Sequence, residues 1–118
     1  MVWQFDENFP IYRQVVNKLR GAIISGELKP GESLPTVRAL STDSGINPNT
    51  AQRALASLES MGLAVCYSTS GRKVTTKQEN IEAQRKVATA ELVRFTLKSI
   101  QEIGLTPEEF AAVLCEKE

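Results

Sequence analysis

Apolar positions near the start of the chain repeat at the three- and four-residue spacing of a helix. They are Ile11, Val15, Val16, Leu19, Ala22 and Ile23. Pro10 suits the first turn of a helix and Gly26 suits its end, so the pattern predicts a helix over about residues 10–25. The run Lys29-Pro30-Gly31-Glu32 predicts a type II turn after it, because Pro and Gly occupy adjacent central positions.

Two more helices are predicted on either side of a break at Ser44-Gly45-Ile46. The first covers about residues 36–43, has Thr36 as its N-cap, and turns Val37, Ala39 and Leu40 inward. The second has Asn47 as N-cap and Pro48 at its first helical position, and it ends at Gly62. Its inward-facing residues are Ala51, Ala54, Leu55, Leu58 and Met61. Two short helices joined by a glycine-containing turn form a helix-turn-helix.

A hairpin and two helices complete the pattern. Leu63–Tyr67 and Lys73–Thr76 are predicted strands joined by the turn Ser68–Arg72, which would place a wing after the helix-turn-helix. A long helix over about residues 77–103 carries a broad apolar face, made of Ile81, Ala88, Leu92, Val93, Phe95, Leu97, Ile100 and Ile103. Thr106-Pro107-Glu108-Glu109 is a capping box that starts a last helix. We expect that helix to bury Phe110, Val113 and Leu114.

The predicted fold is therefore mainly α with a small β-hairpin. It has an N-terminal winged helix-turn-helix over residues 1–76 and a C-terminal two-helix dimerisation segment over residues 77–118. The length of 118 residues suits a small domain with an appendage. With 42% hydrophobic and 24% charged residues, the chain is expected to form a packed core.

Composition argues against several classes of protein. No apolar run approaches the roughly 18 residues of a membrane span, and the first residues lack the pattern of a signal peptide, so we expect a cytoplasmic protein with no membrane partner. The chain has no histidine, and Cys66 and Cys115 fit no metal-ligand spacing. No nucleophile–base pair or glycine-rich phosphate loop is present either, so we expect no enzyme, no metal and no cofactor.

The net charge of zero hides an asymmetry along the chain. Residues 1–78 carry nine Lys and Arg against six Asp and Glu, a net charge of +3. Residues 79–118 carry five against eight, a net charge of −3. A polyanion would therefore bind the N-terminal part.

The second helix of a helix-turn-helix enters the major groove of DNA with its first residues against the base edges. Here that start is polar, and Asn or Gln can bond adenine while Arg can bond guanine. Arg38 on the preceding helix and the basic wing tip could contact the backbone. The candidate DNA-binding residues are Thr36, Arg38, Asn47, Pro48, Asn49, Thr50, Gln52, Arg53, Gly71, Arg72 and Lys73.

A second interpretation remains open from the residues alone. Polar residues are common at helix starts, and Asn47-Pro48 is sufficient as a cap signal without DNA. Helix-turn-helix proteins also include adaptors that bind only other proteins. Against the adaptor, Arg38, Thr50, Arg53 and Arg72 gather with two asparagines around one helix start.

Four motifs resemble the GntR family of transcription regulators. They are Pro10-Ile11-Tyr12-Arg13-Gln14, Gly26-Glu27-Leu28-Lys29-Pro30-Gly31, Leu34-Pro35-Thr36-Val37-Arg38-Ala39-Leu40 and Gly45-Ile46-Asn47-Pro48-Asn49-Thr50. The run Asn47–Thr50 and the short C-terminal extension are similar to the YtrA-type branch. The resemblance implies a sequence-specific transcription regulator that binds a double-stranded, pseudo-palindromic DNA operator as a homodimer. We expect this regulator to act as a repressor.

The resemblance also implies roles for single residues. Arg38 matches an arginine that contacts DNA, Thr50 a phosphate-binding threonine, and Gly71 the glycine of the wing tip. Gln52 stands where many relatives have a base-reading arginine. The wing departs from the family pattern, because relatives usually carry a second glycine near Thr69 and an aromatic residue near Lys73.

The C-terminal segment is predicted to serve dimerisation. Its apolar face could pack on the chain's own first helix, but a regulator that reads two half-sites is expected to be a two-fold dimer. The candidate interface residues are Ala88, Leu92, Phe95, Ile100, Ile103, Phe110 and Leu114. Larger relatives carry a metabolite-binding domain here. Two helices from one chain are too few to enclose such a ligand. Paired with a second subunit they could enclose one, so a small-molecule effector at the dimer interface stays open as an alternative to a regulator without any ligand.

Overall fold

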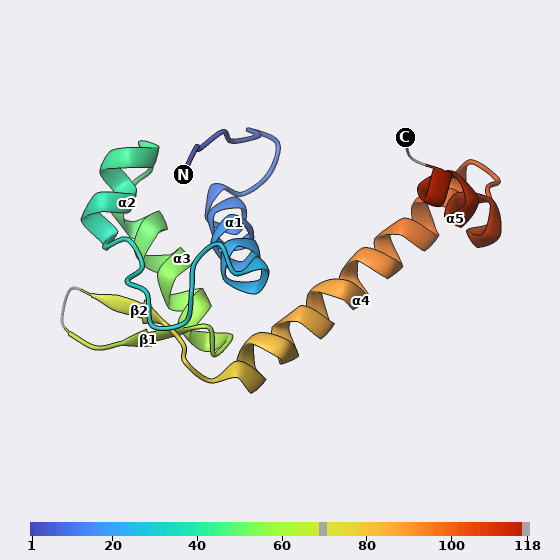
Figure 1. Ribbon diagram of the computed structural model, residues 1–118. Coiled ribbons are helices and arrows are strands. Elements are labelled where there is room, and N and C mark those ends of the chain that lie inside the picture. The colour runs from blue at the N-terminus through green and yellow to red at the C-terminus, as the bar shows by residue number, and fades with distance from the viewer. Residues whose placement is uncertain (69–70, 117–118) are drawn as a thin grey trace. The chain divides into compact units, whose positions relative to one another are not determined.

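The computed structural model (Figure 1) covers the chain and describes every residue except 69–70 and 117–118. Its contacts divide the chain into two compact units, Met1–Gln84 and Arg85–Glu118. The helices and strands, in order, are α1 (Ile11–Ser25), α2 (Val37–Ser44), α3 (Pro48–Ser60), β1 (Ala64–Cys66), β2 (Arg72–Val74), α4 (Gln78–Glu102) and α5 (Pro107–Glu116). The predicted class, mainly helical with one antiparallel hairpin, is confirmed.

The helix boundaries follow the capping residues that the sequence indicated. The Thr36 hydroxyl accepts a hydrogen bond from the Ala39 amide at 3.0 Å. The Asn47 side chain accepts one from the Asn49 amide at 2.7 Å, with Pro48 next to it in the first turn of α3. Each bond satisfies an N–H group that has no partner inside its helix. Gly26 ends α1 in the left-handed conformation, with φ of 90°.

The hairpin is shorter than predicted and has an additional partner. β1 and β2 have three residues each, paired so that Val65 lies opposite Lys73. The other edge of β2 pairs with the segment that leads into α2, since the Leu34 amide donates to the Arg72 carbonyl at 2.8 Å and Ser33 forms a bridge with Lys73. No signal in the sequence indicates this third segment. Two residues of the predicted turn, Thr69 and Ser70, lie outside the described residues.

The core of the first unit forms around α3, which packs against both α1 and α2 (Figure 1). The inward-facing residues predicted for α3 are buried, apart from the half-buried Met61 just after the helix. The largest fully buried aliphatic side chains of the unit are Val15, Leu19, Ile23, Leu40, Leu55, Leu58, Leu63 and Val74. The N-terminal segment adds Trp3 and Phe5, which stack on each other at 5.8 Å and pack against this core.

The first two turns of α4 belong to the first unit. Ile81 is only 3% exposed and is part of its core, and the Asn80 side chain donates to the Gly62 carbonyl at 3.0 Å. The start of α4 is therefore held by the end of α3, through packing and through a hydrogen bond to the backbone.

The second unit contains the rest of α4 and α5. The capping box of α5 is confirmed: the Glu109 amide donates to the Thr106 hydroxyl, and the Thr106 amide donates to the Glu109 carboxylate. The prediction that α5 buries Val113 and Leu114 is wrong for the single chain, where they are 63% and 62% exposed. The half-buried Phe110 lies with Pro107 and α4 side chains around a shared hollow, so the first turn of α5 faces α4.

Replacing Leu55 with alanine tests the central position of α3. Leu55 is fully buried, and removing its side chain leaves a cavity, so we expect a loss of about 2–5 kcal/mol in the free energy of unfolding. Urea denaturation followed by circular dichroism measures this loss. Val65→Ala is the control, because Val65 is 51% exposed and should cost far less. Equal losses in the two variants would contradict the described core.

Candidate nucleic-acid interface

The start of α3 presents polar side chains to solvent because its apolar side is buried in the core. Ala51, Ala54, Leu55 and Leu58 face inward. Asn49, Gln52 and Arg53 are exposed, and Thr50 is half-buried. The first turn of α3 therefore combines rigid anchoring with amide and guanidinium groups that can bond base edges or phosphates.

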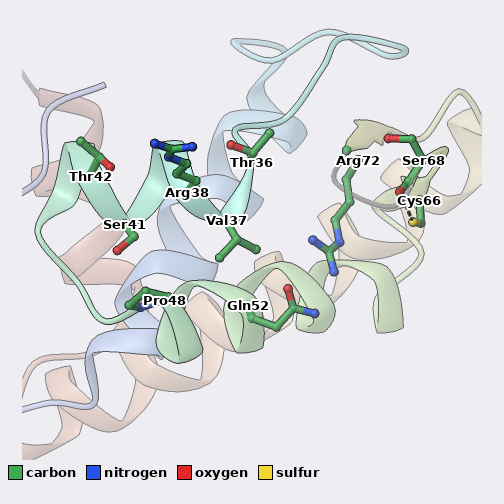
Figure 2. Close-up of a pocket in the computed structure, with 11 residues that line it drawn as sticks. Thr36, Val37, Arg38, Ser41, Thr42, Pro48, Gln52, Cys66, Ser68 and Arg72 are labelled. Carbon is green, nitrogen blue, oxygen red and sulfur yellow. Dashed lines mark hydrogen bonds between the residues drawn. The ribbon is translucent and has the colours of Figure 1, made fainter.

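Six of the predicted DNA-binding residues line one groove between α2, α3 and the hairpin. They are Thr36, Arg38, Pro48, Gln52, Gly71 and Arg72, and Figure 2 labels all of them except Gly71. The groove has a volume of about 670 Å³. Val37, Ser41, Thr42, Cys66 and Ser68 complete its lining. In Figure 2, Arg72 extends from the hairpin toward α3, where Gln52 lies. The fold thus brings together residues that are up to 36 positions apart in the sequence, from Thr36 to Arg72.

Arg72 has a structural partner in addition to its predicted role. Its Nε donates to the Glu59 carboxylate at 2.6 Å, and the two side chains are 13% and 34% exposed. This ion pair ties β2 to the C-terminal half of α3. The positive charge of Arg72 is therefore shared with Glu59, while its neighbour Lys73 is exposed and lies 4.5 Å from the centre of the Tyr67 ring.

The place of Gly71 in the hairpin has a steric cause. A Cβ atom at this position would come within 2.9 Å of the Tyr67 ring, closer than side chains tolerate. Glycine allows the aromatic ring to lie against the backbone, and the Tyr67 amide donates to the Gly71 carbonyl at 3.2 Å. This close approach explains the glycine independently of any contact with DNA.

The other side of α3 faces the beginning of α1. The Arg53 guanidinium lies over the ring of Tyr12, 3.6 Å from its centre. Arg13 donates from its Nε to the Tyr12 hydroxyl at 3.2 Å. This hydrogen bond, with the positive charges of Arg13 and Arg53, lowers the pKa of Tyr12, and the same bond raises the pKa of Arg13. Arg53 was among the predicted DNA-binding residues, whereas Tyr12 and Arg13 were not, because no spacing rule connects the start of α1 to α3.

Two further properties bear on what the protein can do. Among the described residues, no three His, Cys, Asp or Glu side chains gather closely enough to hold a metal ion. None of the helices in the described part of the chain is long and apolar enough to cross a membrane.

Comparisons with known proteins agree with the arrangement of the N-terminal unit. The family model "Bacterial regulatory proteins, gntR family" matches residues 11–74. The chain is 32% identical over 106 residues to the HTH-type transcriptional regulator YhcF of Bacillus subtilis, covering 90% of this chain and 88% of that protein. It is 41% identical over 54 residues to the transcriptional repressor YtrA of Bacillus subtilis, covering 46% of this chain but only 42% of YtrA.

Solved structures extend the similarity to the whole chain. A GntR family transcriptional regulator from Listeria monocytogenes has a TM-score of 0.87 and 29% identity, covering 97% of this chain and all of that one. The DNA-binding domain of AraR, solved in complex with its operator ORX1, has a TM-score of 0.54 and 26% identity over 64% of this chain and 92% of that one. The predicted winged helix-turn-helix and the resemblance to the GntR family are confirmed.

The ion pair between Arg72 and Glu59 can be tested by a double-mutant cycle. Each single alanine variant is expected to lower the free energy of unfolding by about 1–2 kcal/mol, because it leaves a partly buried charge without its partner. The double variant should lose less than the sum of the two, with a coupling energy of about 1 kcal/mol. Urea unfolding of the four proteins gives this value, and additive losses would show that the pair does not hold the hairpin.

Proposed function

The chain belongs to the gntR family of bacterial regulatory proteins, a family of DNA-binding transcriptional regulators, and we propose that it is a sequence-specific repressor that binds a pseudo-palindromic operator as a homodimer. In this proposal α3 enters the major groove of the operator. The single observation that carries it is the groove beside the start of α3, where six candidate DNA-binding residues gather from three separate elements.

The chemistry of α3 fits the reading of base edges. Asn49 and Gln52 carry exposed amide groups, which can bond adenine through both a donor and an acceptor. Asn47 uses its side-chain oxygen to cap α3, so it contributes to binding mainly by holding the helix start in place. The uncovered N–H groups of the first turn add a favourable position for a phosphate.

Cationic side chains on the elements next to α3 supply the contacts that orient the domain on the phosphate backbone of the DNA. Arg38 is exposed on α2 and lines the same groove as Gln52. Lys73 is exposed on the hairpin. Backbone contacts of this kind fix the register of a regulator on DNA and make its affinity depend on salt.

The names of related proteins support the repressor part of the proposal. Three relatives in the same family are called repressors: YtrA and NagR of Bacillus subtilis and the mannosyl-D-glycerate system repressor MngR of Escherichia coli. Binding an operator without contacting RNA polymerase is sufficient to block transcription, so a small chain can act in this way.

The second unit supports dimerisation through a second copy of the chain. Leu92 and Phe95 on α4 are 67% and 71% exposed, and Ile103, just after the end of the helix, is 76% exposed. Ile100 is 5% exposed and supports this face from within the chain. Covering large exposed apolar side chains favours association, and a two-fold dimer would present two copies of α3 to successive half-sites.

Arg38→Ala tests the DNA-binding surface. Removing an exposed guanidinium that contacts DNA should weaken operator binding by about tenfold or more, while the melting temperature stays the same. Fluorescence anisotropy with a labelled operator measures the affinity. Arg38→Lys keeps the charge and separates a bidentate contact from a purely electrostatic one. Unchanged affinity of the alanine variant would remove Arg38 from the interface.

Phe95→Asp tests the dimer. A carboxylate in the middle of an apolar interface should shift the protein to monomer in sedimentation velocity. Ala90→Asp is the matched control: Ala90 is also exposed on α4, but five residues correspond to about 140° around a helix. A Phe95→Asp protein that stays dimeric, with the sedimentation coefficient of the wild type, would place the interface elsewhere.

A further inference from the structure

A hollow opens on the side of α3 that faces α1, away from the groove of Figure 2. It has a volume of about 400 Å³ and is lined by Ile11, Tyr12, Asn49, Thr50 and Arg53. The residues at its edge differ from those of the groove, which Pro48 and Gln52 line from α3. The start of α3 is therefore bordered by two distinct surfaces.

Arg53 is held in this hollow by an aromatic ring instead of a carboxylate. Its guanidinium stacks on Tyr12 at 3.6 Å, and among the described residues it has no acidic partner. Stacking orders a long side chain while its N–H groups remain available at the edge of the guanidinium plane. Arg72, in contrast, donates its Nε–H group to the Glu59 carboxylate.

Arg13 adds a second guanidinium at the same ring. Its Nε donates to the Tyr12 hydroxyl, and its central carbon lies 5.9 Å from the ring centre. The two arginines are thus gathered at one tyrosine, and no Asp or Glu in the described part of the chain pairs with either of them. Two like charges brought together without a counter-ion provide a site for an anion.

DNA supplies such an anion on each side of a helix that lies in its major groove. The groove is about 12 Å wide and is bounded by the phosphates of both strands. The proposed function requires α3 to lie in the major groove of DNA. The protein surface lined by Arg38 then faces one DNA strand, and the hollow lined by Arg53 faces the other strand. Positions 49 and 53 are one turn apart and lie on this second side of α3.

We propose that Tyr12, Arg13 and Arg53 form a clamp for a backbone phosphate of the DNA strand on the α1 side. Arg53 and Arg13 contact the phosphate, and Tyr12 is a positioning residue that holds both guanidinium groups. Arg53 therefore contributes affinity for any duplex and does not select a base. This inference rests on the proposed function, because it assumes that α3 enters the major groove.

The test measures how the affinity for duplex DNA depends on salt. The first probe is an operator obtained by selecting the duplexes that the chain binds from a random pool, and the second is a single random-sequence duplex. Both are about 30 base pairs long, enough for two half-sites about one helical turn apart. The slope of log K against log salt reports the number of neutralised phosphates, at about 0.9 for each contact. Arg53→Ala should bind both probes about tenfold more weakly and reduce the slope by about 2, because the dimer loses one phosphate contact in each subunit.

Tyr12→Leu separates positioning from direct contact. The variant keeps both arginines but removes the stack, so it should lose part of the affinity and part of the slope. If Tyr12 acts by holding Arg53, Tyr12→Leu should weaken DNA binding less in the Arg53→Ala background than in the wild type. A double-mutant cycle of the two substitutions measures this difference. Tyr12→Phe keeps the ring and should recover most of the Arg53 contribution. Circular dichroism melts confirm that each variant is folded at the temperature of the binding assay.

Lys18→Ala is the matched control. Lys18 is also an exposed cation of α1, but its Nζ lies over Trp3, 5.5 Å from the ring centre, and Trp3 lines a different hollow with Glu27, Glu32 and Asp43. Removing this charge should leave the slope unchanged, although the net charge changes as it does in Arg53→Ala.

Three results would overturn the clamp. An unchanged slope for Arg53→Ala would show that Arg53 contacts no phosphate. A loss of affinity for the operator alone, with the random duplex unaffected, would make Arg53 a base-reading residue. Equal effects of Lys18→Ala and Arg53→Ala on affinity and slope would show that both arise from the change in net charge and not from a specific phosphate contact. Wild-type protein that binds neither probe would instead contradict the proposed function itself.

Discussion

The burial of one side of α3 between α1 and α2 is the interaction on which the rest of this structure depends. Ala51, Ala54, Leu55 and Leu58 are all completely buried there. Packing on two helices at once fixes the rotation of α3 about its axis, because turning it would expose Leu55 and Leu58. The same rotation determines which polar side chains border the groove toward α2 and which border the hollow toward α1. A helix that reads DNA must be held in this way, since small displacements change every base contact.

The arginines around α3 differ in the groups that they contact, and these contacts determine which of them can bind a phosphate. Arg72 is paired with Glu59 and joins the hairpin to α3. Arg53 rests on Tyr12 and keeps its hydrogen-bonding edge available. Arg38 is exposed on α2. A count of charges treats all of them alike, whereas the contacts separate a structural arginine from those available to a phosphate.

Local signals in the sequence were sufficient for most of the fold. Helical periodicity located α1 and α3, and the caps Thr36, Asn47 and Thr106 made the bonds expected of them. Long-range contacts were less accessible. The pairing of Ser33 with Lys73 has no signature within its own segment, and the stack of Arg53 on Tyr12 joins helices whose facing sides are known only once they pack. The exposed Leu114 shows the opposite error, since an apolar pattern predicts burial without saying which surface provides it.

Selection from a pool of random duplexes shows whether this chain binds a two-fold symmetric operator. The full chain would be incubated with the pool at about 0.15 M salt, where weak backbone binding is suppressed, and the bound duplexes sequenced. We expect recovery of one two-fold symmetric motif, with half-sites about one helical turn apart, because a dimer would place its two copies of α3 in successive major grooves. Failure to enrich any sequence, or enrichment of a single half-site without symmetry, would contradict it.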